Sequence, residues 1–297
     1  MEQQKQKKIY HLLQARKNKH DEYFTMYQDI EAECLHYVKH FEGKTVYCNC
    51  DNPHESNFVK YFKENFETLK LKNLYASCKP LDKNLPALFY SYDGQKETFT
   101  EKENAGGDFR SAECRAILGK ADIVVTNPPF SLLRDFVALL IAHKKDFIVI
   151  GSLICCGYKG IFEYFQQNTL RIGHTCPKWY FVPDYVQDYT KRINGSPAKC
   201  ISSLWLTTFP VNRVEKKKPV TKLLKFDDYD ATNVDRLEDL PNKKNDTNTY
   251  GVPITFLVKY NQDSPWKITG KIRPKVDGKR VFTRILIQKK QLFPKHN

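Results

Sequence analysis

Residues 121–133, ADIVVTNPPFSLL, constrain the fold of this chain more than any other stretch. The run of residues 121–126 is apolar and rich in β-branched side chains, which predicts a buried strand. Two consecutive prolines then stop that strand, because proline fixes its own φ angle, lacks a backbone N–H and pushes the preceding residue out of the helical region. We therefore expect a strand, a rigid loop and a helix in direct succession.

The alternation of strand and helix continues on both sides of this loop. Apolar runs predict strands over residues 44–51, 72–78, 121–126 and 146–152, and helical spacing predicts helices over residues 57–69 and 132–143. A polar connection separates the second of these strands from Gly106. Strands that alternate with helices pair in parallel and are covered by helices on both faces. The expected fold class is α/β, with a mostly parallel, doubly wound sheet that binds ligands at the carboxyl ends of its strands.

The amino-acid composition of the chain changes after Pro210. Residues 211–250 are polar and loop-rich, and they lead into GVPITFLVKY (residues 251–260) and a basic tail. We therefore expect a larger domain over residues 1–210, which carries the proline loop, and a smaller region over residues 211–297.

Positive charge is concentrated in that smaller region. The formal net charge is +14, and residues 266–297 hold ten basic residues against one acid, Asp277. Apolar residues alternate with the charges over residues 279–290, which indicates a folded strand and not a solvated tail. Such a patch is typical of proteins that bind nucleic acid. The residues that we expect to contact the nucleic acid are Lys271, Arg273, Lys275, Lys279, Arg280 and Arg284.

The cysteines and the apolar runs limit where the protein works. The first twenty residues are polar and basic without an apolar signal segment, and the longest apolar runs are too short to cross a bilayer. Nine cysteines in such a chain indicate reduced thiols in an intracellular, cytoplasmic protein that has no contact with membranes. The closest pairs, Cys48/Cys50 and Cys155/Cys156, form no CxxC knuckle, so we expect no metal.

The proline loop offers a specific binding chemistry. The Asn127 side-chain amide and the Pro128 carbonyl can both accept hydrogen bonds, Pro129 keeps the loop rigid, and Phe130 offers a flat ring. Two acceptors on an exocyclic amine favour a pyramidal nitrogen whose lone pair can attack an electrophilic methyl group. A ring stacked on a base would hold that base out of the duplex. The loop therefore matches a planar group that bears an NH2.

At these residues the chain resembles the S-adenosylmethionine-dependent amino-methyltransferases, whose catalytic signature is [DNS]PP[YFW]. Further blocks are similar to the EcoRI-type adenine-specific DNA modification methylases, namely residues 18–37, 46–67, 106–114, 122–137, 251–260 and 278–287. The blocks span nearly the whole chain. The resemblance implies a fold of the class I S-adenosylmethionine-dependent methyltransferase type, a catalytic domain over residues 1–210, a DNA-recognition region over residues 211–297, and methylation of adenine N6 in a flipped-out base of duplex DNA.

The resemblance also implies roles for individual residues. Asn127, Pro128 and Phe130 would bind and activate the adenine N6, and Pro129 would hold the loop. The residues that it assigns to the cofactor are Asp21, Tyr23, Phe24, Thr25, Asn49, Asp51 and Asp108. Among them, Asn49 and Asp51 lie in CNCDNP, where most methyltransferases have a glycine-rich FxGxG turn, and Tyr23 and Phe24 stand in swapped order relative to the usual Phe-Tyr. No acid follows the second strand to hold the cofactor ribose.

Three alternatives share part of this interpretation. A protein glutamine methyltransferase carries a similar Asn-Pro-Pro loop, because a side-chain amide is also a planar NH2 group. Phosphate attraction does not distinguish an RNA adenine methyltransferase from a DNA enzyme. A non-catalytic nucleic-acid-binding protein could retain the fold without activity. The basic tail and the intact loop favour the DNA enzyme. Its expected partners are double-stranded DNA and a restriction endonuclease of the same system, and its expected cofactor product is S-adenosylhomocysteine. We expect the protein to be a monomer or a weak dimer.

Overall fold

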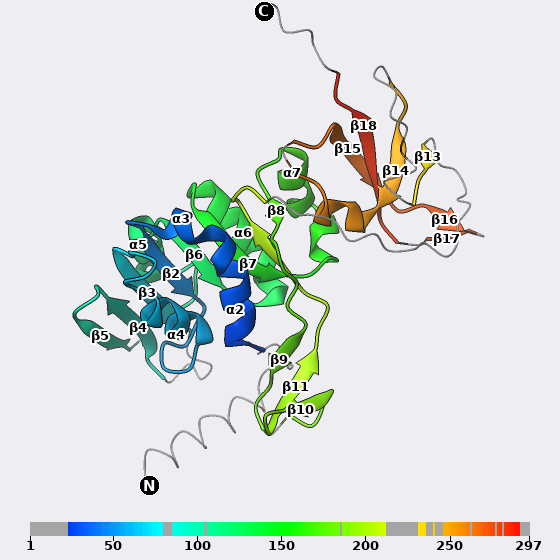
Figure 1. Cartoon of the computed structure of the whole chain (residues 1–297). Coiled ribbons are helices and arrows are strands. Elements are labelled where there is room, and N and C mark those ends of the chain that lie inside the picture. The colour runs from blue at the N-terminus through cyan, green and yellow to red at the C-terminus, as the bar shows by residue number, and fades with distance from the viewer. Residues whose placement is uncertain are drawn as a thin grey trace, which may run out of the picture. The chain divides into compact units, whose positions relative to one another are not determined.

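The chain divides into two units. Residue contacts group residues 1–152 with 173–209 in the first unit, and residues 153–172 with 210–297 in the second. Figure 1 shows the elements of both. The computed structural model describes residues 23–79, 85–103, 106–184, 186–211, 231–235, 240, 246–261, 263–276, 278–280 and 282–291.

A mixed sheet forms the centre of the first unit. Seven of its strands lie in the order β5-β4-β3-β2-β6-β7-β12. The strands are β2 (Thr45–Asn49), β3 (Asn73–Cys78), β4 (Ala87–Tyr92), β5 (Glu97–Lys102), β6 (Ile123–Thr126), β7 (Asp146–Gly151) and β12 (Leu204–Thr207). The pairs β2–β3, β2–β6 and β6–β7 are parallel, whereas β3–β4, β4–β5 and β7–β12 are antiparallel. The α/β class is confirmed.

The expectation of a mostly parallel sheet needs correction at both edges. The polar connection before Gly106 contains β4 and β5, which extend the sheet antiparallel to β3. All six residues of β5 are exposed, so its sequence ETFTEK has no buried face to reveal it as a strand. On the other side of the parallel strands, β12 pairs antiparallel with β7.

Helices pack against the sheet, and the longer ones do so through an apolar face. They are α2 (Tyr27–Cys34), η1 (Leu35–Tyr37), α3 (Val38–Phe41), α4 (Asn57–Glu64), α5 (Ala112–Lys120), η2 (Phe130–Leu132) and α6 (Leu133–Ala142). Helix α4 begins at the N-cap Ser56, whose Oγ accepts from the backbone N–H groups of Phe58 and Val59. In α6 the buried residues Leu133, Phe136, Val137 and Leu140 follow helical spacing.

A smaller antiparallel sheet also belongs to the first unit. It consists of β1 (Phe24–Thr25), β9 (Trp179–Phe181), β10 (Lys191–Ile193) and β11 (Ser196–Cys200), in the order β1-β9-β11-β10. Asn194 and Gly195 join β10 to β11 with φ angles of 49° and 84°. Positive φ at both central residues is the geometry of a type I′ turn, which Asn-Gly favours.

The second unit is built on a four-stranded sheet and a two-stranded hairpin. The sheet order is β13-β14-β18-β15, and β16 pairs with β17. The elements are η3 (Cys155–Gly157), α7 (Ile161–Gln166), β8 (Arg171–Ile172), β13 (Thr232–Asn233), β14 (Tyr250–Pro253), η5 (Ile254–Val258), β15 (Trp266–Ile272), β16 (Lys275–Val276), β17 (Lys279–Arg280) and β18 (Arg284–Lys289). The strand expected in the basic tail is confirmed as β18.

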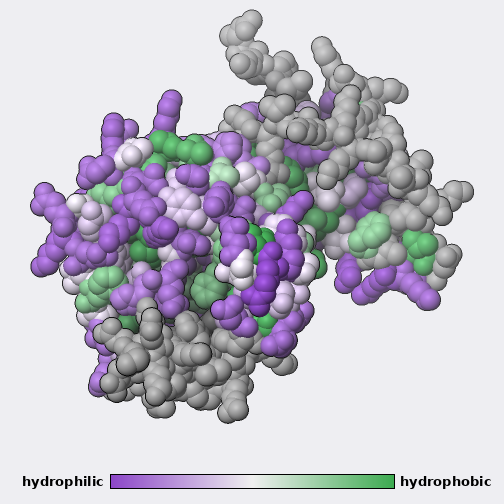
Figure 2. Space-filling model, turned by 60° about the horizontal axis from the view of Figure 1, so that its bottom comes forward, coloured by the Kyte–Doolittle hydropathy of each residue, from purple (hydrophilic) through white to green (hydrophobic). Residues whose placement is uncertain are grey.

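In the described ranges, none of the helices has the length and apolar character needed to cross a bilayer. On the face shown in Figure 2, hydrophilic residues predominate and hydrophobic residues form separate patches.

Candidate active site

The site residues meet where the strand order of the large sheet reverses. The chain passes from β2 to β3 on one side and then crosses to β6 on the other side of β2. The three strands are parallel, so their carboxyl ends, at Asn49, Cys78 and Thr126, lie at one edge. Such a switch point is where open α/β sheets bind ligands.

The amide of Asn127 is held in one orientation. Its Nδ2 donates to the backbone carbonyl of Tyr23 over 2.8 Å. Its Oδ1 is buried and has no hydrogen-bond partner in the described residues. Because an unpaired buried acceptor is costly, this oxygen marks a position where a ligand donor is needed.

The prolines set the rest of the loop. Pro128 is buried and Pro129 half-buried. The Pro129 carbonyl accepts from the backbone N–H of Leu132 over 2.9 Å and closes the first turn of η2. Phe130 begins that turn and is half-buried, with its ring packed against the large apolar core. The loop therefore offers one free amide oxygen beside one partly accessible ring.

The N-terminal segment lies beside the loop. Strand β1 pairs with β9, with Phe24 opposite Phe181 and Thr25 opposite Tyr180. The Thr25 backbone carbonyl accepts a hydrogen bond from Asn57 Nδ2 over 2.8 Å. The Thr25 hydroxyl, Oγ1, is buried and has no hydrogen-bond partner among the described residues. The structure thus brings Tyr23, Phe24 and Thr25 to the Asn-Pro-Pro-Phe loop. Asp21 lies outside the described residues.

A buried carboxyl group joins the ends of β2 and β6. Asp51 accepts from Ser56 Oγ over 2.7 Å and from Thr126 Oγ1 over 2.5 Å. Burial raises the pKa of Asp51 to about 7, although both hydrogen bonds lower it in part. Thr126 directly precedes Asn127, so Asp51 connects the turn after β2 to the Asn-Pro-Pro-Phe loop. No feature of the sequence marks Thr126 as this partner, because 75 residues separate it from Asp51.

Asn49 is fully buried at the end of β2. Its Oδ1 accepts from Ser77 Oγ over 3.3 Å. Its Nδ2 is a buried donor without a partner in the described residues. The same edge of the sheet therefore presents an unpaired donor at Asn49 and an unpaired acceptor at Asn127.

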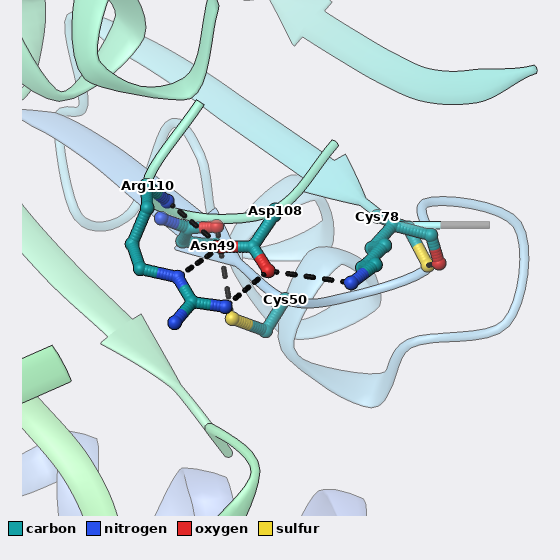
Figure 3. Close-up of polar contacts among 6 residues, drawn as sticks. Asn49, Cys50, Cys78, Asp108 and Arg110 are labelled. Carbon is teal, nitrogen blue, oxygen red and sulfur yellow. Dashed lines mark hydrogen bonds and ion pairs between the residues drawn. The ribbon is translucent and has the colours of Figure 1, made fainter. Parts of the chain in front are cut away.

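Asp108 lies near the end of β3 and forms ion pairs with two basic side chains. Arg110 donates to both carboxylate oxygens, with Nε at 2.8 Å and Nη2 at 2.9 Å, and Lys79 Nζ lies 3.4 Å away (Figure 3). The Arg110 hydrogen bonds lower the pKa of Asp108 to about 2. Gly107 has a φ of 51°, and an added Cβ would lie 2.6 Å from the Cys78 carbonyl oxygen. Only glycine allows this approach. The sequence singled out Asp108 but not Arg110 or Lys79.

Two of the expected DNA contacts are used inside the second unit. Arg284 is 1% exposed, and its guanidinium donates to Asp235 Oδ1 over 2.6 Å and to the Gly251 carbonyl over 2.7 Å. Lys271 Nζ donates to the Gly157 carbonyl over 2.6 Å. The other four, Arg273, Lys275, Lys279 and Arg280, are exposed on or beside the β16–β17 hairpin. We therefore leave Arg284 and Lys271 out of the proposed DNA contacts.

Two large aromatic residues of the first unit are part of the core. Tyr180 and Trp205 are fully buried in the large apolar cluster, whereas Trp179 is half-buried. In the described part of the chain, no group of three or more His, Cys, Asp or Glu side chains could hold a metal ion.

An α/β sheet whose switch point carries an Asn-Pro-Pro-Phe loop with a free amide oxygen defines an amino-methyltransferase. The chain belongs to the family described as adenine-specific methyltransferase EcoRI, whose model matches residues 11–105 and 91–271. The resemblance seen in the sequence is confirmed, and the chain is an adenine-specific DNA methyltransferase.

Curated relatives cover almost the full length of the chain. Type II methyltransferase M.EcoRI of Escherichia coli is 38% identical over 95% of this chain and 97% of its own length. Type II methyltransferase M.MgeORF184P of Mycoplasma genitalium is 33% identical over 96% of this chain and 100% of its own. Type II methyltransferase M.MpnI of Mycoplasma pneumoniae is 32% identical over 95% and 99%. No solved structure showed a significant match to the chain.

Proposed function

We propose that this protein transfers a methyl group from S-adenosylmethionine to N6 of an adenine that is flipped out of double-stranded DNA. The observation that carries the proposal is the buried Asn127 Oδ1, which lacks a partner in the described residues while Nδ2 of the same amide is held by Tyr23. An acceptor fixed in this way has no described protein donor to compete with the N6 hydrogens of the target base.

The loop residues act on the base itself. Asn127 Oδ1 accepts one N6 hydrogen and the Pro128 carbonyl accepts the other, which favours a pyramidal N6 with an available lone pair. Phe130 stacks on the adenine ring and holds it outside the duplex. Pro129 restricts the loop so that the two acceptors keep their directions.

The carboxyl ends of β2 and β3 in the large sheet, together with β1 of the small sheet, offer polar groups suited to S-adenosylmethionine. The unpaired donor at Asn49 and the unpaired hydroxyl at Thr25 are polar groups that need a partner. Gly107 permits close backbone approach beside Asp108. When bound, the cofactor supplies an electrophilic methyl group on a sulfonium sulfur. Tyr23, Phe24, Thr25, Asn49 and Asp108 would hold it, and Asp51, whose carboxyl is already occupied by Ser56 and Thr126, positions the turn between cofactor and base.

The arrangement of the sheet supports a class I methyltransferase fold. Its centre is the parallel set β3-β2-β6-β7, with the order reversing at β2, and an antiparallel strand follows β7. The edge strands β4 and β5 are additions to that pattern. Residues 1–210 would carry cofactor and catalysis, and residues 211–297 would carry DNA recognition through the four exposed cations around β16 and β17.

The relatives are named Type II methyltransferases, which belong to restriction-modification systems. A restriction endonuclease of the same system would recognise the same site, and the methyltransferase would act as a monomer or weak dimer. Cytoplasmic DNA would be its substrate.

The test of this function is methyl transfer from tritiated S-adenosylmethionine to unmethylated duplex DNA, followed by nucleoside digestion. The expected product is labelled N6-methyladenine. Label in RNA or in protein glutamine, with none in DNA, would overturn the proposed substrate and leave the loop chemistry in place. Cofactor binding without label in any acceptor would contradict the assigned catalytic role.

A further inference from the structure

The hairpin formed by β10 and β11 extends the first unit away from its large sheet (Figure 1). Its tip is the type I′ turn at Asn194 and Gly195, and the residues around it, Lys191, Arg192 and Ser196, are exposed. The apolar core does not explain why the chain builds this projection. Because β10 pairs with β11 and β11 with β9, the backbone of the hairpin is held against the rest of the small sheet.

The charges of this projection are unbalanced. Residues 178–200 hold four cations, Lys178, Lys191, Arg192 and Lys199, and two acids, Asp184 and Asp188. Lys199 pairs with Asp188, and Arg192 Nη1 lies 3.9 Å from Asp184 Oδ1. In the part of the chain that the structure describes, Lys178 and Lys191 have no carboxylate within ion-pair distance. Both are exposed, so the projection carries two uncompensated positive charges.

One of these charges is held in place by an aromatic ring. Lys191 Nζ lies 4.0 Å from the centroid of the Trp179 ring. A cation above an indole face keeps its charge while its long side chain loses freedom. Lys178 is the residue directly before Trp179. The pairing of β9 with β11 continues to Lys178, whose carbonyl accepts from the backbone N–H of Ile201, so the Lys178 side chain lies on the opposite face of the small sheet from Trp179 and Lys191. The sheet therefore presents an exposed cation on each face, one of them over a half-buried tryptophan, and such a combination of charge and flat apolar surface is typical of nucleic-acid-binding surfaces.

The projection is joined to the catalytic loop through hydrogen-bonded strands. Lys191 pairs with Ala198, Ala198 with Phe181, and Phe181 with Phe24. The carbonyl of Tyr23, next to Phe24, accepts the hydrogen bond from Asn127. One small sheet thus connects an exposed cationic surface to the amide that we assign to the target base.

We propose that Lys178 and Lys191 form a second DNA-backbone contact, on the catalytic unit itself, that holds phosphates of the strand next to the flipped adenine. This inference rests on the proposed function, because the small sheet matters to the reaction only where Asn127 binds the base. The basic hairpin β16–β17 lies in the second unit, whereas the small sheet belongs to the same unit as Asn127. A contact on the small sheet sets the register of the DNA against Asn127 directly, since the strands between it and Tyr23 are paired.

The test compares DNA affinity at several salt concentrations for the wild-type protein and for a double variant, Lys178→Gln with Lys191→Gln. Each phosphate contact contributes about 0.9 to the slope of log affinity against log salt concentration, so the double variant should lose about 1.8 from that slope and bind about tenfold more weakly at moderate salt. Lys178→Arg with Lys191→Arg keeps both charges and should restore the slope. Lys120→Gln, on the last residue of α5, is the matched exposed control and should leave it unchanged.

The outcomes separate this inference from the proposed function. An unchanged slope and affinity in the double glutamine variant would overturn the second contact, whatever the catalytic result. If Lys191→Gln lowers the unfolding midpoint through its packing on Trp179, the single variant Lys178→Gln, which leaves that ring contact intact, decides the question through a slope loss of about 0.9. The readout is binding, so it does not depend on methyl transfer. Failure of Asn127→Ala to stop transfer would contradict the proposed function and leave this binding result standing.

Discussion

Asn127 Nδ2 donates to the carbonyl of Tyr23 over 2.8 Å, across 104 residues of sequence. The bond orients the amide so that Oδ1 remains as the free acceptor. A rotatable amide could present either its donor or its acceptor to a ligand, and only the acceptor can bind an exocyclic amine. The pairing of β1 with β9 therefore determines the chemistry of a loop far away in the chain.

Two substitutions of Asn127 test the roles of its Oδ1 acceptor and of its Nδ2 hydrogen bond to Tyr23 separately. Asn127→Ala removes the acceptor and should lower the rate of methyl transfer by about 10²–10³-fold, as loss of a transition-state hydrogen bond does in other enzymes. Asn127→Asp keeps an acceptor but loses the donor to Tyr23, and should cost about tenfold because the Tyr23 carbonyl is left unpaired. Single-turnover transfer rates at saturating DNA measure both effects.

DNA affinity is the control for these two variants. Both should bind DNA as the wild type does, because neither change touches the exposed cations. A normal transfer rate in Asn127→Ala would rule out the two-acceptor mechanism.

Phe130 should matter for engagement of the base. Stacking on an aromatic ring contributes roughly 1–3 kcal/mol per base, so Phe130→Ala should weaken occupancy of the flipped state by that amount. Phe130→Tyr retains the ring and should behave as the wild type. Fluorescence of 2-aminopurine at the target position measures the flipped population, and equal signals from Phe130→Ala and the wild type would contradict stacking. Phe130 also packs on the core, so the unfolding midpoint of each variant must be measured alongside.

Asp51 should make stability depend on pH. Its pKa rises from 3.8 to about 7 in the folded protein, so the folded state binds the proton more tightly than the unfolded state. The stability from this group is therefore fully present below about pH 4 and is lost as pH rises through 7. Asp51→Asn cannot ionise. Between pH 5 and pH 8 the wild type should lose about 2–3 kcal/mol of unfolding free energy relative to this variant.

Denaturant unfolding of both proteins at several pH values measures that difference. Curves that stay parallel from pH 5 to pH 8 would show that Asp51 keeps an ordinary pKa and would contradict its burial as a protonated group.

The basic residues of the second unit should fall into two groups, one that stabilises the fold and one that binds DNA. Arg284 belongs to the first group. Arg284→Met leaves the Asp235 carboxylate, whose side chain is 11% exposed, without its ion-pair partner and removes a buried guanidinium that bonds to two backbone carbonyls, so it should destabilise the protein by about 3 kcal/mol. Arg284→Lys should recover little, because an ammonium cannot reproduce the planar set of donors. Thermal unfolding at fixed salt measures both.

Lys279→Gln with Arg280→Gln is the matched pair of exposed substitutions. It should leave the unfolding midpoint unchanged and reduce the salt slope of DNA binding by about 0.9 for each phosphate that the variant fails to bind. A large stability loss in this pair, or none in Arg284→Met, would reverse the assignment.

Local rules predicted the parts of the fold that depend on neighbouring residues. The prolines ended β6 at Thr126, and helical spacing identified α6, because proline geometry and side-chain periodicity act within a few residues. Strand β5 was not predicted, since an exposed edge strand has no apolar face. The position of Arg284 was not predicted either: the alternation of charged and apolar residues places it on a strand but does not say which face the rest of the unit covers.

The sequence by itself determined that Asn127, Pro128 and Phe130 form a rigid loop after a buried strand, and that the chain is an EcoRI-type methyltransferase. Only the tertiary structure decided that Asn127 is held by Tyr23, and that Asp51 bonds to Thr126. Loop geometry depends on backbone angles that each residue restricts by itself or through its neighbours. Hydrogen bonds between distant residues depend on how whole strands pair, and no spacing in the sequence records that pairing.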